Sequence, residues 1–296
     1  MKKITLLFIS ICSISFVFAQ QLQTSSFYDM QGLLYNPAMA GVQSKNIVAA
    51  TYRTQWTGIS GSPKTATLYG SFAIPKMGAG IGGYLFNDVT GPTARRGLNL
   101  DLAKHIDLGE GEKLSLGIEA KLQQYSLDKN KLTSSMAADP VLAGADNKMK
   151  FDAGFGVAYA GKQLTIGASV SQLVQSKLQF YSGNLTRTEE ARLYRHYYLH
   201  AAYKWNIDGV TNIIPNLLVT YLPNAPTEFQ GGFTVEHHNI IWWGLSAKLK
   251  QSFMASAGFK VNNQLKIGYS FDAYKTPLSS FDNGFNAHEF VVRYEF

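Results

Sequence analysis

The chain has 296 residues, of which 13% are aromatic and only 16% are charged, whereas soluble domains average roughly 25% charged residues. Its formal net charge of +7 comes from scattered lysines and arginines, without a dense basic run or a basic-aromatic stripe. Nucleic acid is therefore excluded as an expected partner.

The first 19 residues have the pattern of a secretory signal peptide. Lys2 and Lys3 precede an apolar run at positions 4–18, and Ala19 stands at the expected cleavage site. A membrane anchor is the alternative, but the run is shorter than the about 18–20 residues that a spanning helix needs. Cleavage would lower the formal charge from +7 to +5 and remove Cys12, the one cysteine of the chain. The mature chain would then have no disulfide and no cysteine nucleophile.

Residues 20–46 do not show the periodicity of a strand. The dipeptide Asn36-Pro37 interrupts regular structure within this segment. An apolar group precedes it, made of Phe27, Tyr28, Leu33, Leu34 and Tyr35. So many apolar side chains favour a segment packed against other residues, with a loose leader as the alternative.

From residue 47 to the end of the chain, apolar and polar residues alternate. In KLSLGIEAKLQQY, Leu114, Leu116 and Ile118 share one face, while Glu119 and Lys121 lie on the other, which is typical of a strand. About fourteen such segments occur, most near the roughly 9–11 residues that cross a bilayer at a tilt. They are residues 47–56, 65–74, 78–87, 95–106, 113–126, 150–160, 163–172, 192–205, 213–222, 227–236, 240–248, 252–261, 263–272 and 287–296. A secreted β-sandwich and a transmembrane β-barrel both fit this pattern.

The lengths of the connections favour the barrel. The even-numbered connections are short, whereas the long ones, at residues 127–149, 173–191 and 273–286, are all odd-numbered. Outer-membrane barrels with periplasmic termini sort their loops in this way, and a sandwich has no reason to do so. We therefore predict an all-β fold: a transmembrane antiparallel β-barrel of about 14 strands in the bacterial outer membrane. Residues 47–296 form the barrel, both termini are periplasmic, and residues 20–46 line or plug its lumen.

The same alternation predicts which side chains face the lumen and which face lipid. The predicted lumen face carries both signs of charge, which favours ion pairs between strands over a charge-selective pore. These residues are Asp101, Glu119, Lys121, Asp152, His200, Lys204, Lys248, Lys260, Asp272, Glu289 and Arg293. Aromatic residues near strand ends indicate the girdles that barrels carry at membrane interfaces. They are Tyr194, Tyr197, Tyr198, Tyr203, Trp205, Trp242, Trp243, Tyr269, Phe271, Tyr294 and Phe296.

No motif indicates catalysis, a cofactor or a metal. GAGIGG at residues 78–83 has dinucleotide-binding spacing, but it opens a predicted strand, so its glycines are expected to bend that strand or leave room in the lumen. His196 and His200 share a face, yet their Cα atoms would be about 13 Å apart, too far for one metal ion. A Ser-His-Asp site assembled from distant residues stays open, but no G-x-S-x-G elbow is present. We expect a protein that is not an enzyme.

Three stretches near the start of the mature chain resemble the PorP/SprF family of Bacteroidetes outer-membrane proteins. They are LLYNPAMAG with Asn36, Pro37 and Gly41, YRTQWTGISGSP with Arg53, Gln55, Trp56, Gly61 and Pro63, and GAGIGGYLFNDVTGP with Asn87 and Asp88. The terminal HEFVVRYEF is also similar to the last strand of that family. The resemblance implies an accessory component of the type IX secretion system that supports export or surface anchoring of cargo proteins, such as gliding adhesins.

The resemblance also implies partners: a secreted cargo protein with a type IX C-terminal domain, other components of the secretion system, and outer-membrane lipid. We expect the cargo to contact the long odd-numbered loops, because aromatic and arginine side chains are enriched at interfaces. The candidate residues are Phe180, Tyr181, Arg187, Tyr274, Phe281 and Phe285. Loops that close the barrel mouth are the alternative for these residues. The alternative function is an outer-membrane channel for small solutes, including hydrophobic ones.

Overall fold

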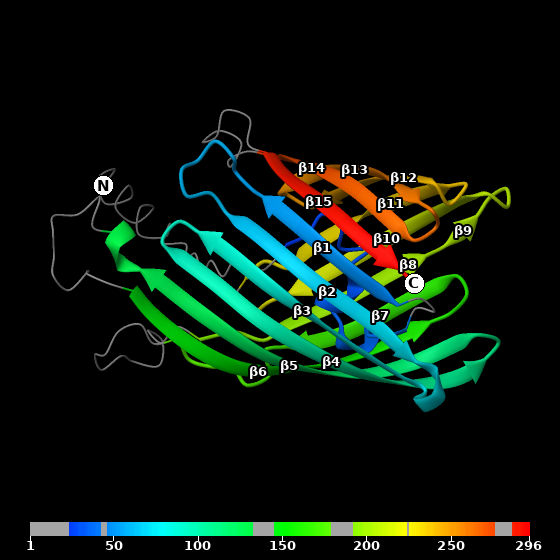
Figure 1. Ribbon diagram of the computed structural model, residues 1–296, viewed down its shortest axis with the longest axis horizontal. Coiled ribbons are helices and arrows are strands. Elements are labelled where there is room, and N and C mark those ends of the chain that lie inside the picture. The colour runs from blue at the N-terminus through cyan, green and yellow to red at the C-terminus, as the bar shows by residue number, and fades with distance from the viewer. Residues whose placement is uncertain (1–23, 43–45, 133–144, 179–191, 224, 276–285) are drawn as a thin grey trace, which may run out of the picture.

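The strands form one antiparallel sheet that closes on itself into a barrel (Figure 1). The computed structural model describes residues 24–42, 46–132, 145–178, 192–223, 225–275 and 286–296. Neighbours along the chain pair in order, and β15 pairs with β1. The two-residue β9 continues β8 beyond Lys204, so fifteen strand segments build a wall of fourteen strands within the described residues. The predicted fold class is confirmed.

The strand boundaries lie close to those predicted, apart from β3–β6, which are longer, and β8, which begins at His196 and not at residue 192. Each of the short 3-10 helices in the described residues has three residues, and none is long and apolar enough to cross a membrane. These helices are η1 (Gly32–Leu34), η2 (Pro37–Met39), η3 (Pro75–Met77) and η4 (Lys129–Lys131). The strands are β1 (Ile47–Thr54), β2 (Lys64–Ile74), β3 (Ala79–Thr90), β4 (Thr93–Gly109), β5 (Glu112–Asp128), β6 (Ala145–Ala160), β7 (Leu164–Ser171), β8 (His196–Tyr203), β9 (Trp205–Asn206), β10 (Thr211–Tyr221), β11 (Glu228–His237), β12 (Ile241–Lys248), β13 (Ser252–Val261), β14 (Leu265–Tyr274) and β15 (Asn286–Glu295).

The two faces of the wall differ in polarity as the alternation predicts. On β4, Asn99 and Asp101 are buried toward the lumen, while the outward Leu98, Leu100 and Leu102 are 38%, 57% and 51% exposed. An outward apolar face exposed to this extent is what a bilayer covers. Most of the charged residues predicted for the lumen are buried: Asp101, Glu119, Lys121, Asp152, Lys248, Lys260, Asp272, Glu289 and Arg293.

The connections sort by length between the two ends of the barrel, which we call the long-loop end and the short-turn end. The connections after β5, β7 and β14 leave from the end at which β1 stops. At the opposite end, β4 and β5 are joined by Glu110 and Gly111 alone, and the C-terminal strand β15 also stops there (Figure 1). The connection between β3 and β4 has only Gly91 and Pro92 and is shorter than predicted, because these strands extend further.

The predicted orientation, with the long-loop end outside the cell, can be tested with single cysteines, since the one native cysteine lies in the predicted signal peptide. Glu110, at the short-turn end, is 85% exposed, and Lys131, at the long-loop end, is 59% exposed. We expect an impermeant maleimide to label Lys131→Cys on intact cells and Glu110→Cys only after lysis. The reverse pattern would show that the termini are extracellular.

Candidate functional site

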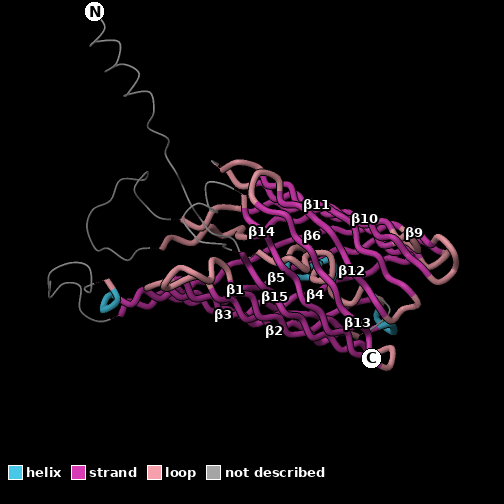
Figure 2. Tube along the Cα trace, turned by 90° about the horizontal axis from the view of Figure 1, so that it is seen from above, coloured by secondary structure: helices cyan, strands magenta, loops and turns pink. Residues whose placement is uncertain are grey.

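Residues 24–42, here called the lumen segment, lie inside the barrel and run along it. Thr24 lies at the long-loop end, where its hydroxyl accepts a hydrogen bond from Gln55 Nε2 at 3.3 Å. Gly41 lies toward the other end, where its N–H donates to Ser71 Oγ at 2.8 Å. η1 and η2 belong to this segment and appear within the strand wall in both views (Figures 1 and 2). The segment therefore passes through the lumen from the long-loop end to the short-turn end.

A buried ion cluster holds the start of the lumen segment. On β1, Arg53 donates from Nη2 to Asp272 Oδ2 at 2.6 Å and from Nη1 to Glu289 Oε2 at 3.2 Å. The same Nη1 donates to Ser26 Oγ at 2.5 Å. Both carboxylates also accept from the segment, because Ser26 Oγ donates to Asp272 at 2.6 Å and Ser25 Oγ donates to Glu289 at 2.7 Å. Strands β1, β14 and β15 thus share one polar network with the segment.

The cluster constrains the barrel as well as the segment. Arg53, Asp272 and Glu289 are 5%, 1% and 1% exposed, so each charge depends on its partners for the hydrogen bonds that water would supply. Removing one member of such a network leaves a buried charge uncompensated, which destabilises a protein far more than losing a surface pair. The network is consequently a strong determinant of where the segment lies.

Apolar and polar contacts continue the attachment along the segment. Phe27 packs edge-to-face on Trp242, with 5.8 Å between the ring centroids, and Val291 completes this buried cluster. Asp29 Oδ2 accepts a hydrogen bond from Thr234 Oγ1 at 2.8 Å. Thr234, Trp242 and Val291 lie on β11, β12 and β15, respectively, so the segment contacts several strands at once.

Asn36 fixes the middle of the lumen segment and is fully buried. Its side-chain oxygen accepts from the N–H of Ala38 at 2.9 Å, which caps η2, and Pro37 follows it as the first residue of that helix. Its amide nitrogen donates to the carbonyl of Val157 at 3.0 Å and lies 3.0 Å from His200 Nε2. The Asn-Pro pair therefore shapes the turn and also attaches it to β6 and β8.

Glycines on the wall make room for the segment. A Cβ on Gly80 would lie 2.1 Å from the carbonyl oxygen of Ala40, and one on Gly156 would lie 2.0 Å from Asn36 Oδ1. Real Cβ atoms do not approach so closely, so the segment can occupy this path only where the wall lacks side chains. Gly80 belongs to GAGIGG at residues 78–83, and the expectation that these glycines leave room in the lumen is confirmed at that position.

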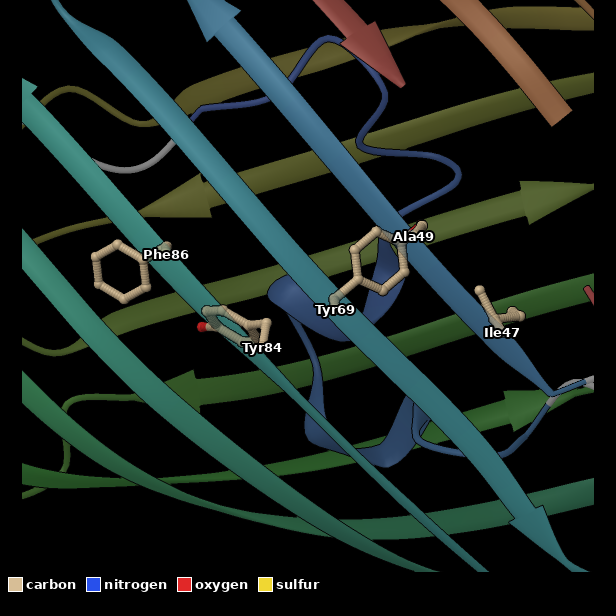
Figure 3. Packing of buried hydrophobic residues seen from close by; sticks show 5 residues of the cluster. All are labelled: Ile47, Ala49, Tyr69, Tyr84 and Phe86. Carbon is tan, nitrogen blue, oxygen red and sulfur yellow. The ribbon is translucent and has the colours of Figure 1, made fainter. Parts of the chain in front are cut away.

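A second cluster faces the lumen segment from β1, β2 and β3. Figure 3 shows Ile47, Ala49, Tyr69, Tyr84 and Phe86. Leu34 of the segment packs against this cluster. A polar network begins at its edge, because Asn99 Nδ2 donates both to Tyr84 OH and to Glu119 Oε1 at 2.6 Å, and Glu119 forms an ion pair with Lys121 at 3.0 Å. Glu119 and Lys121 both lie on β5, so this pair is within one strand. The predicted ion pairs between neighbouring strands are formed by Lys248 with Glu228 at 2.8 Å and by Arg53 with Glu289 at 3.2 Å.

Two cavities in the lumen border the segment, beside a smaller one of about 40 Å³ at Leu34 and Tyr35. One of about 160 Å³ lies at the long-loop end beside Thr24, Arg53 and Trp56. Another of about 410 Å³ lies between the segment and the β7–β15 wall, where Asp29 and Lys266 are among its lining residues. No group of three or more histidine, cysteine or acidic residues in the described part of the chain could hold a metal ion.

The residues predicted to bind a partner are mostly not described. Phe180, Tyr181, Arg187, Phe281 and Phe285 lie outside the described residues, as does the predicted signal peptide. Tyr274 ends β14, and its hydroxyl accepts hydrogen bonds from Gln55 Nε2 at 3.1 Å and from Arg53 at 3.4 Å. A role for these residues in binding cargo stays a prediction.

The motif residues from the start of the mature chain fall into four places. Asn36, Pro37, Gly41 and Arg53 contact or belong to the lumen segment, and Gln55 and Trp56 border the small cavity at the long-loop end. Gly61 and Pro63 lie between β1 and β2, where the Gly61 carbonyl accepts from Gly91 N–H at 2.8 Å. Asp88 faces inward and accepts from Thr65, whereas Asn87 faces outward.

The chain matches the model of a known protein family over nearly its whole length. Residues 17–294 match the family described as type IX secretion system membrane protein PorP/SprF. This chain belongs to the PorP/SprF family. Family membership and the closed barrel place the protein in the outer membrane, as a membrane protein of the type IX secretion system.

Solved structures share the barrel fold of this PorP/SprF protein at low sequence identity. The outer membrane protein Omp33 of Acinetobacter baumannii has a TM-score of 0.51 at 7% identity, with 86% of this chain and 100% of that chain covered. The toluene transporter TbuX of Ralstonia pickettii has a TM-score of 0.50 at 10% identity, with 89% and 92% covered. Among curated proteins, none matches this sequence. At these identities the likeness concerns the fold alone.

Proposed function

We propose that this PorP/SprF protein is a non-catalytic accessory component of the type IX secretion system that supports export or cell-surface anchoring of one cargo protein, such as a gliding adhesin. The observation that carries the proposal is the attachment of the lumen segment by Arg53, Asp272, Glu289 and Asn36. A lumen crossed by a segment held through buried charges suits a rigid support better than a free solute path. The C-terminal domain of the cargo is the part expected to bind.

The long-loop end is the proposed contact surface for the cargo. The three longest connections leave the barrel there, and Tyr274 and Trp56 lie at the same end with ring centroids 6.4 Å apart. Long loops add little to the cost of closing a chain and commonly carry function. Aromatic side chains at such a rim are suited to anchor a partner.

A channel for small solutes is the second candidate, and the two cavities favour it. They lie along the lumen segment and share the barrel with it, so a displaced segment would join them into one path. This function requires the segment to move, whereas the accessory role requires it to stay in place.

Replacing Phe180, Tyr181, Phe281 and Phe285 together with serine is expected to release the cargo from the cell surface into the medium. The change removes apolar anchors from the long-loop end and leaves the strands untouched. Surface and medium fractions of the cargo are measured by immunoblotting, and heat-modifiable migration shows that the barrel is folded.

The matched control replaces three exposed apolar residues of the short turns, Ile207, Val210 and Ile240, with serine. It is expected to leave cargo display unchanged. Unchanged display in the loop variant would refute the proposed contact surface. Rapid solute flux through the unmodified protein in liposomes would favour the channel instead.

A further inference from the structure

A shallow groove lies on the lipid-facing side of β1–β6, outside the lumen. Its volume is about 870 Å³. Small residues form its floor, namely Ala50, Ala66 and Gly97, and outward apolar residues such as Leu85 and Leu98 form its sides. An acyl chain fits a groove of this kind better than it fits a flat apolar wall, because more of its surface is contacted.

Arg96 stands at one end of this groove and faces outward. Its Nε donates to Asn87 Oδ1 at 2.9 Å, and Gln124 is its cross-strand neighbour on β5. Its terminal nitrogens have no partner among the described residues. The adjacent Arg95 differs, because it faces the lumen, forms an ion pair with Asp88 at 3.8 Å and lies over an aromatic ring. The terminal nitrogens of Arg96 therefore remain available to a ligand, while its Nε contacts β3.

The position of Arg96 along β4 places it at headgroup level. Lys104 lies on the same outward row toward the short-turn end, where its Nζ donates to the carbonyl of Met77 at 2.6 Å. Arg96 and Lys104 are eight residues apart, which is about 27 Å along the strand and roughly 20 Å in height at a strand tilt of about 40°. Leu98, Leu100 and Leu102 lie between them, and barrels carry an apolar band about 25 Å tall. The two cations thus lie near the two boundaries of that band, and their long side chains can extend to the headgroups.

We propose that the groove and Arg96 bind one phosphorylated lipid of the outer leaflet, of the lipopolysaccharide class. An acyl chain lies along Ala66 and Gly97, and a phosphate accepts hydrogen bonds from the guanidinium. A planar guanidinium matches two phosphate oxygens at once, and its contact with Asn87 holds it in place. Gln124 is placed to contact sugar hydroxyls beside the phosphate. The outer leaflet follows from the orientation with the long-loop end outside.

The test of this site is the binding of bisphosphorylated lipid A, measured by native mass spectrometry. The protein is folded in detergent and free of lipid. Arg96→Gln is expected to weaken binding at least tenfold, because a charge-assisted contact with phosphate is lost. Lys104→Gln is the matched control, since it removes the other outward cation of the same strand, and it is expected to bind as the unmodified protein does. A lipid A without phosphates should also bind weakly to the unmodified protein. Its affinity is expected to equal that of bisphosphorylated lipid A for Arg96→Gln.

A second variant tests the groove without altering the charge. Ala66→Trp fills the floor of the groove and keeps Arg96, and it is expected to weaken the binding of lipid A at least fivefold. This variant tests the site even where Arg96→Gln fails to fold. Equal losses in Arg96→Gln and Lys104→Gln would show attraction by charge alone and overturn the proposal. Unchanged binding of lipid A by either Arg96→Gln or Ala66→Trp would also overturn the proposal. So would a finding that the unmodified protein binds phosphatidylethanolamine as tightly as lipid A.

Discussion

Replacing Arg53 with methionine is expected to lower the free energy of unfolding by about 3–5 kcal/mol, the range for breaking a buried ion pair from one side. The variant leaves Asp272 and Glu289 buried without a cation. The carboxylates then keep as hydrogen-bond donors the hydroxyls of Ser25 and Ser26, the N–H of Ser26 and, at 3.5 Å, the hydroxyl of Ser270. The urea midpoint of the barrel, followed by its heat-modifiable migration in detergent, measures the loss. Because Ser25 and Ser26 belong to the lumen segment, that segment is expected to loosen as well.

Arg95→Met is the matched control for this variant. Arg95 Nη2 lies 3.8 Å from Asp88 Oδ2, and these side chains are 18% and 21% exposed. Arg95 also lies over the ring of Phe86 at 5.1 Å, so losing both contacts is expected to lower stability by about 1–2 kcal/mol, less than the loss for Arg53→Met. A triple variant, Arg53→Met with Asp272→Asn and Glu289→Gln, is expected to regain part of the lost stability, because no buried charge remains. Equal losses for Arg53→Met and Arg95→Met would show that the cluster does not hold the barrel.

Gly80→Ala is expected to displace the lumen segment from its path. The added Cβ would lie 2.1 Å from the carbonyl oxygen of Ala40, and no side-chain rotation can separate them, because the backbone fixes the positions of both atoms. In an Ala38→Cys background, the labelling rate of the thiol by a small maleimide is expected to rise at least tenfold, since Ala38 is fully buried in the native barrel. Solute flux in liposomes is expected to increase in parallel.

Gly231→Ala is the matched control for the glycine variant. Its Cβ would meet the nearest heavy atom, the Asn216 carbonyl oxygen, at 3.3 Å, which a small adjustment relieves. The labelling rate at position 38 is expected to stay at its native value. If Gly80→Ala leaves that rate unchanged as well, the lumen segment tolerates the overlap and is not held by the shape of the wall.

Residues far apart in the sequence meet in the lumen in ways that alternation cannot predict. Asp272 and Glu289 were both predicted to face the lumen, but their contact with Arg53 depends on the closure of the barrel and the register of β14, β15 and β1. Trp242 and Trp243 were both expected in an interface girdle. The structure buries Trp242 against Phe27 and leaves Trp243 42% exposed, because adjacent strand residues point to opposite faces.

The sequence by itself determined the strand count, the two faces and the sorting of the loops. It could do so because successive side chains of a strand point to opposite faces, and a bilayer requires one of these faces to be apolar and every backbone group to be paired. The tertiary structure alone decided the direction of the lumen segment, the Arg53 cluster and the groove below Arg96. Each of these depends on which strands lie side by side and at what register, and local periodicity carries no information about register between distant strands.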